Sequence, residues 1–149
     1  MRKMKNSKGF TLMEMLIVVA IIAVLIAIAI PTFNASLNKA KVATDEANIR
    51  SGYASVMAEV LTADENFETE KTYTLKTDGG VYTGTVNGVT DYVCKGEVKV
   101  KNPDDAANPT VEIAGKKVNA WKPGAKVTYT VKSTGDELDV AINVTNPKP

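Results

Sequence analysis

A single carboxylate adjoins the most apolar stretch of the chain. Residues 15–30 contain no polar side chain, and Glu14 lies directly before them, three residues after Thr11. An acidic side chain near the centre of a membrane costs about 3 kcal/mol, so we expect a compensating interaction. Thr11-x-x-Glu14 matches a capping box, in which both side chains satisfy free amides at a helix N-terminus. Glu14 is also about 6 Å of helix from Phe10 and could reach water. Both explanations account for the tolerated charge and leave a charge-pairing role open.

The other reactive side chains do not form a catalytic set. The chain has no histidine, its only thiol is Cys94, and no serine or lysine has a recognisable nucleophile setting. We therefore predict that the protein is not an enzyme and has no metal site or cofactor. Cys94 beside a predicted strand is expected to be a half-buried small hydrophobe, although an exposed thiol could cross-link subunits.

Four groups in the second half of the chain allow two interpretations each. Asp104-Asp105 and Asp136-Glu137 could bind calcium, but paired acids in loops are usually solvated turn residues. Lys116-Lys117 is interpreted as a charged turn rather than a binding patch. Trp121 could be a surface anchor for a partner or a core aromatic at a strand end.

Length and charge predict one modest globular head and do not support nucleic-acid binding. The chain has 149 residues, which fits a single domain. The first nine residues hold four basic side chains and no acid, so the remaining chain carries 14 basic against 17 acidic side chains, a net charge of −3. A nucleic-acid-binding head would normally show a net basic face.

The apolar segment has the length of a membrane span. Residues 10–30 would form a helix of roughly 30 Å, the thickness of a bilayer core, which exceeds the apolar region of a secretory signal peptide. No small-x-small cleavage site follows the segment, and Pro31-Thr32-Phe33-Asn34 continues into another helical pattern. We therefore expect this segment to remain in the mature protein.

The residues around Glu14 form an ordered motif. The string Lys8-Gly9-Phe10-Thr11-Leu12-Met13-Glu14, followed by the apolar run and Pro31, resembles the prepilin signature of the type IV pilin family. The resemblance covers roughly the first third of the chain. It implies that a membrane peptidase cleaves after Gly9 on the cytoplasmic side and methylates the new amino terminus of Phe10. It also implies that Glu14 is the assembly carboxylate and that Pro31 is the kink in the first helix.

The chemistry of these positions is consistent with that resemblance. Gly9 has no side chain and lets an extended backbone approach a peptidase closely, whereas the simpler interpretation makes it a loop residue before a helix. A cationic Phe10 terminus could pair with Glu14 of its own chain or of a neighbour. The resemblance favours the neighbour, because only that pairing selects for assembly.

The resemblance implies a structural subunit that assembles with copies of itself into a type IV pilus-like filament. Its partners would be the prepilin peptidase and the inner-membrane pilus assembly machinery. Before assembly it would cross the cytoplasmic membrane once, with its head on the extracytoplasmic side, and afterwards it would lie in a cell-surface pilus or an envelope pseudopilus. Two alternatives remain: a pseudopilin of a type II secretion or competence DNA-uptake system, and a monomeric membrane-anchored binding module.

We expect an α+β fold, in which a long N-terminal helix packs on an antiparallel β-sheet head. The predicted divisions are a leader at 1–9, a membrane or filament-core half of the helix at 10–30, an amphipathic half at 31–62, and a β-rich head at 63–149. Spacings of 7, 4, 3 and 4 place five apolar residues on one helical stripe suited to cover a sheet: Val42, Ile49, Tyr53, Val56 and Val60.

Alternation of apolar and polar residues from Thr72 onward predicts the strands of the head. Turn residues separate them, notably Asp78-Gly79-Gly80, Asn87-Gly88 and Gly135-Asp136. The expected strands form three hairpins, 72–77 with 81–86, 110–114 with 117–121, and 126–133 with 138–144, and a further strand is expected at 93–101.

Overall fold

The computed structural model describes residues 9–63, 70–99, 111–134 and 137–149 of the chain. The described residues form one long helix, α1 (Leu12–Thr62), and six strands. The chain divides into two compact units, one ending at Leu37 and the other running from Asn38 to Pro149. Each unit contains part of α1.

The first unit contains the apolar part of α1, which begins at Leu12 as the capping motif predicts. The helix continues through Pro31, although a proline nitrogen has no hydrogen to donate to the preceding turn. Beside it, the Thr32 hydroxyl donates to the carbonyls of Ile28 and Ala29 at 3.2 and 2.9 Å. A helical backbone is therefore kept across Pro31, and the kink stays a prediction.

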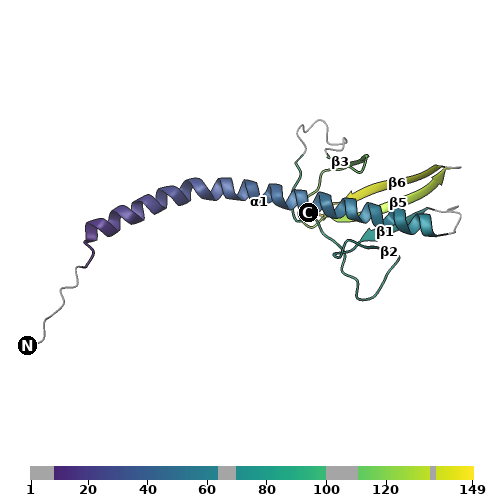
Figure 1. Ribbon diagram of the computed structural model, residues 1–149, viewed down its shortest axis with the longest axis horizontal. Helices are drawn as coiled ribbons and strands as arrows, with labels where there is room; N and C mark the ends of the chain where they lie inside the picture. Colours follow the sequence, from purple (N-terminus) through teal and green to yellow (C-terminus); the bar gives the residue numbers. More distant parts are fainter. Residues whose placement is uncertain (1–8, 64–69, 100–110, 135–136) are drawn as a thin grey trace, which may run out of the picture. The chain divides into compact units, whose positions relative to one another are not determined.

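The second unit packs residues 38–62 of α1 along one face of an antiparallel sheet (Figure 1). The predicted stripe is confirmed as the contact face, because Ile49 and Val56 are fully buried and Val60 nearly so. The Tyr129 hydroxyl donates to the carbonyl of Ile49 at 2.8 Å. A Cβ atom at Gly52 would lie 2.5 Å from Leu75 Cδ1, so glycine permits the close approach of helix and sheet. The predicted α+β fold is confirmed.

The main sheet has the strand order β2-β1-β5-β6, with every pair antiparallel. Burial alternates along the strands, so one face contributes Tyr73, Leu75, Val127, Tyr129, Val131, Val140 and Ile142 to the core. Two further strands pair as a separate hairpin. The bounds are β1 (Lys71–Leu75), β2 (Val81–Thr83), β3 (Val111–Ile113), β4 (Lys116–Val118), β5 (Lys126–Thr134) and β6 (Glu137–Thr145).

The three predicted hairpins are confirmed, with shorter strands in two of them. β2 ends at Thr83, before the predicted end at residue 86, and residues 87–88 form a turn as expected. The interpretation of Lys116-Lys117 as a turn was wrong, because both residues lie in β4. The turn is at Ala114-Gly115, where both residues have positive φ angles, and Gly115 lies between the two strands that the sequence predicts for this hairpin.

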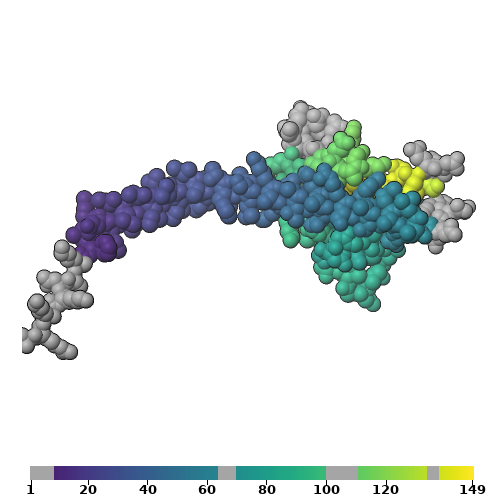
Figure 2. Space-filling model, viewed as in Figure 1, coloured from purple at the N-terminus to yellow at the C-terminus, as the bar shows by residue number. Residues whose placement is uncertain are grey.

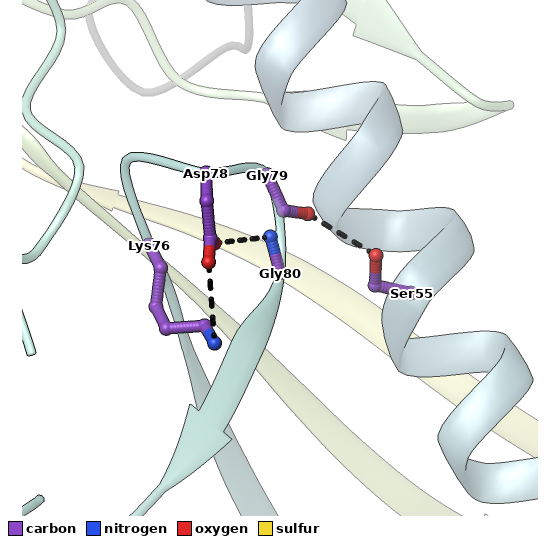
Figure 3. A network of polar contacts seen from close by, with 5 residues as sticks. All are labelled: Ser55, Lys76, Asp78, Gly79 and Gly80. Atoms are coloured by element: carbon purple, nitrogen blue, oxygen red, sulfur yellow. Dashed lines mark hydrogen bonds and ion pairs between the residues drawn. The ribbon is translucent and has the colours of Figure 1, made fainter.

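The turn between β1 and β2 contacts α1 (Figure 3). The Asp78 carboxylate accepts a hydrogen bond from the amide of Gly80 at 2.9 Å and forms an ion pair with Lys76 at 3.6 Å. The Ser55 hydroxyl of α1 donates to the carbonyl of Gly79 at 3.1 Å. These contacts fix the end of the hairpin against the helix.

The predicted strand at 93–101 was wrong over its described part, residues 93–99. Only Val93 joins a strand there, through one isolated bridge to Lys126. The amides in the middle of this segment bond to side chains of α1 and not to a strand: Gly96 donates to the Asp45 carboxylate at 2.8 Å, and Glu97 donates to the Asn38 side chain at 3.1 Å. Side chains of the helix thus hold this segment as a loop.

Candidate functional site

The predicted processing site lies immediately before α1. Phe10 is 83% exposed, and Gly9 is also exposed. A Cβ atom at Gly9 would meet no atom within 4 Å among the described residues. This open surrounding is compatible with approach by a peptidase, while the cleavage and methylation assigned to Gly9 and Phe10 stay predictions.

Thr11 and Glu14 form the capping box that their spacing predicts. Glu14 Oε2 accepts hydrogen bonds from the Thr11 amide at 2.7 Å and from the Thr11 hydroxyl at 2.9 Å. In return, the Thr11 hydroxyl accepts from the Glu14 amide at 3.3 Å. The isolated chain therefore stabilises its helix terminus with the same side chain that the motif assigns to assembly.

The geometry at Glu14 leaves room for a second interaction. Both side-chain hydrogen bonds end on Oε2, and Oε1 accepts none from the described residues. A carboxylate has about four lone-pair sites, so Oε1 can accept a hydrogen bond while Oε2 keeps the cap. Capping and charge pairing are thus compatible at one residue.

The helix of the first unit exposes its apolar side chains along its whole length. Met15, Ile22 and Leu25 are 56%, 48% and 61% exposed, and Figure 2 shows this segment as a continuous rod of side chains. By length and composition α1 could cross a membrane. A shallow apolar hollow of about 310 Å³ lies on it, lined by Ala20, Ile21, Val24 and Leu25. Such a surface requires lipid or another apolar helix to cover it.

A buried acid of the second unit, Asp45, was missed by the sequence predictions. Its side chain is fully buried and accepts hydrogen bonds from four groups. The donors are the Tyr92 hydroxyl, the amides of Lys95 and Gly96 at 3.0 and 2.8 Å, and the Trp121 indole N–H at 3.2 Å. Its place between Val42 and Ile49 on the apolar stripe was the available signal, because an acid on a buried face needs several donors.

The surroundings of Asp45 show which of the two interpretations holds for Trp121 and which holds for Cys94. Trp121 is fully buried, so the surface-anchor interpretation was wrong and the core interpretation is confirmed. Cys94 is 1% exposed, which goes beyond the predicted half-burial. Burial raises the pKa of its thiol to about 12, and the negative charge of Asp45 adds to this effect. Burial also raises the pKa of Tyr92, helped by its hydrogen bond to Asp45. The folded chain therefore offers no reactive thiol at Cys94 for cross-linking.

The candidate calcium ligands fall outside the described part of the chain. This applies to Asp104-Asp105, to Asp136 and to the side chain of Glu137. Among the described residues, no group of three or more acids, cysteines or histidines could hold a metal ion.

The N-terminal motif and the wider chain both resemble known proteins. A family profile described as the prokaryotic N-terminal methylation motif matches residues 4–30. A fimbrial protein of Pseudomonas aeruginosa is 29% identical over 132 residues, covering 89% of this chain and 84% of that protein. No solved structure gives a match.

Two relatives from Thermus thermophilus extend the comparison. The major component of its narrow type IV pilus is 38% identical over 91 residues, covering 57% of this chain and 77% of that protein. The major component of its wide type IV pilus is 57% identical over 37 residues, covering 25% of this chain. The aligned length reaches well beyond the N-terminal motif. With its exposed apolar helix and its α+β head, the chain therefore belongs to the type IV pilin family, whose members are structural subunits of pili.

Proposed function

We propose that this chain is the structural subunit of a type IV pilus, made as a membrane-anchored precursor and assembled through its N-terminal helix. Residues 1–9 are the leader, and cleavage after Gly9 creates a methylated amino terminus at Phe10. Residues 10–30 span the cytoplasmic membrane before assembly and pack with identical helices afterwards. The head, on the extracytoplasmic side, then forms the surface of the filament.

The observation that carries this proposal is the uncovered apolar helix with a carboxylate at its start. Fully burying one large aliphatic side chain is worth about 1.5–3 kcal/mol, and residues 15–30 offer many such side chains. Lipid covers this surface in the precursor and identical helices cover it in the filament. A monomeric anchored module would need only the lipid, and Glu14 would serve it only as a helix cap.

Glu14 supplies direction to the assembly. Removing the leader leaves a cationic amine at Phe10, four residues from Glu14. Oε1 of Glu14 accepts nothing from the described residues, so a neighbour's amine can bind there without breaking the cap on Oε2. Within an apolar layer the attraction between the two charges is weakly screened. The ion pair therefore stabilises a subunit that enters the filament with its amino terminus beside a neighbour's carboxylate.

The test separates the charge of Glu14 from its capping role. Glu14→Gln keeps an acceptor oxygen for Thr11 but removes the charge, so we expect processing at Gly9 and a loss of at least about tenfold in sheared filament, equivalent to ~1.4 kcal/mol. Thr11→Ala is the matched control, because it removes the capping hydroxyl and keeps the charge. We expect its filament yield to stay near wild type.

The measurement is an immunoblot of membrane and sheared-surface fractions at matched expression, with mass spectrometry of the N-terminal peptide. The expected mature terminus is methylated Phe10. If Glu14→Gln gives wild-type amounts of sheared filament and Thr11→Ala gives reduced amounts, the role of this pair of residues is capping alone. An intact Met1 in assembled material, or a terminus beyond Ile30, would contradict the processing scheme. Electron microscopy that shows only dispersed protein would favour the monomeric alternative.

A further inference from the structure

One end of the second unit carries a cluster of exposed lysines. This is the end at which the chain enters the unit at Asn38, and we call it the lysine end. Its members come from α1, from the loop at 93–99, from the loop after Trp121 and from the C-terminal segment: Lys39, Lys41, Lys95, Lys99, Lys122 and Lys148.

Hydrogen bonds between these segments build the lysine end. The Asn38 side chain donates to the carbonyl of Glu97 at 3.1 Å and accepts from its amide. The Val98 amide donates to the carbonyl of Trp121 at 2.9 Å. The amide of Lys122 donates to the Asn146 side chain at 2.8 Å, which joins the C-terminal segment to the same end. The lysines are thus displayed on a fixed framework.

Four described lysines outside this end form ion pairs with acids of the same unit. Elsewhere, Lys76 pairs with Asp78, Lys116 with Asp139 and Lys132 with Glu70. Within the described residues, the six members of the lysine end form no ion pair. The described acids nearby are the half-buried Glu46 and Glu97, the buried Asp45, and Asp91, which pairs with Lys126. Described residues therefore give this end a net positive charge with its cations free to meet an external anion.

We propose that the lysine end binds the anionic phospholipid surface of the membrane that holds the precursor. This inference rests on the proposed function, which places residues 10–30 in the bilayer. Lys39 follows Ile30 by nine residues, or about 14 Å of helix, and the headgroup layer on each side of a bilayer is about 6 Å thick. The remaining separation is similar to the Debye length of about 8 Å at physiological salt. Basic residues this close to an anionic surface are attracted to it.

The occupant is a lipid surface because of where the chain places these charges. A free polyanion could approach the head from any side, but the lysines gather at the end joined to the apolar span. In the precursor, the interaction keeps this end of the head against the membrane. This interaction is lost when the subunit leaves the membrane and joins the filament.

The experiment uses the full-length chain reconstituted at low density into vesicles. One set contains phosphatidylcholine alone, and the other an equal mixture of phosphatidylcholine and phosphatidylglycerol. A membrane-impermeant amine reagent is added outside, and the labelling of each lysine is measured by mass spectrometry. We expect labelling of the lysine end to fall about twofold in the anionic vesicles, because an attraction of ~1 kcal/mol per lysine at the surface falls to about a third over one Debye length. High salt should restore it.

The same molecule provides the controls. Lys76 and Lys132 are ion-paired and lie elsewhere in the unit, so their labelling should be equal in both vesicle types. Replacing Lys95 and Lys122 with glutamine should weaken the protection of the remaining four lysines, while Lys76→Gln should not.

Equal labelling of the lysine end in both lipids would refute the proposal. So would protection that rises with protein density in neutral vesicles, since that would indicate contact with a second copy. The assay needs neither cleavage nor filament formation. Its failure would therefore leave the filament proposal standing, and failure of the filament proposal would leave the labelling result valid.

Discussion

Replacing Asp45 should destabilise the head more than any other single loss of an acid among the described residues. The Asp45 carboxylate accepts from the Tyr92 hydroxyl, from two backbone amides and from the Trp121 indole, all in a fully buried site. The hydroxyl can rotate toward another acceptor, but the other three donors are fixed by the fold.

The magnitude follows from those donors. Each buried donor left without an acceptor costs about 1–3 kcal/mol, and water entering the cavity recovers part of this. We therefore expect Asp45→Ala to lower the free energy of unfolding by about 4 kcal/mol, within the usual cost of breaking a buried charged network. Asp45→Asn keeps one acceptor oxygen and should cost about 2 kcal/mol. A total stability of about 5–15 kcal/mol makes both changes easy to detect.

The assay is urea unfolding of the full-length chain in mild detergent, followed by the fluorescence of Trp121, the only tryptophan. Glu46→Gln is the matched control, because Glu46 is the next residue of α1 and is only half-buried, and we expect a change below about 0.5 kcal/mol. Hydrogen exchange at the amides of Lys95 and Gly96 should accelerate in both Asp45 variants. If Asp45→Ala unfolds at the wild-type urea concentration, the network contributes little to stability and this reasoning is refuted.

Three further predictions test the core of the second unit. A chain starting at Thr32 should be soluble and monomeric and should melt cooperatively, because its core lies after residue 37; circular dichroism and sedimentation would show this, and aggregation without a transition would contradict it. Gly52→Ala should destabilise by about 1–3 kcal/mol despite alanine's better helix propensity, because its Cβ would overlap Leu75 and Tyr129; a stabilised variant in urea unfolding would count against the packing described. Cys94 should resist alkylation near pH 8 in the folded chain and react in urea. Burial raises the pKa of its thiol to about 12, so little thiolate exists at pH 8 in the folded protein. Rapid labelling of the folded protein would disprove the burial of Cys94.

Local patterns in the sequence determine the elements of this protein. The capping box at Thr11 and Glu14 starts the helix because its hydrogen bonds span only three residues. The apolar run and the later stripe mark the two parts of α1, since helical periodicity is a property of neighbouring residues. The hairpins are similarly local, because each joins segments separated by a short turn.

Only the tertiary structure decided the loop at 93–99, the strand order and the burial of Trp121. The alternation of apolar and polar residues from Val93 onward is typical of a strand. The amides of residues 95–97 nevertheless donate to the side chains of Asp45 and Asn38, which lie more than 45 residues earlier in the chain. Nothing local to either segment indicates that pairing. The sequence around Asp45 and the sequence around Trp121 each allow more than one structure. The two side chains form part of the core only because folding brings the carboxylate and its hydrogen-bond donors together away from water. The cost of burying a charge without its donors is what makes that arrangement specific.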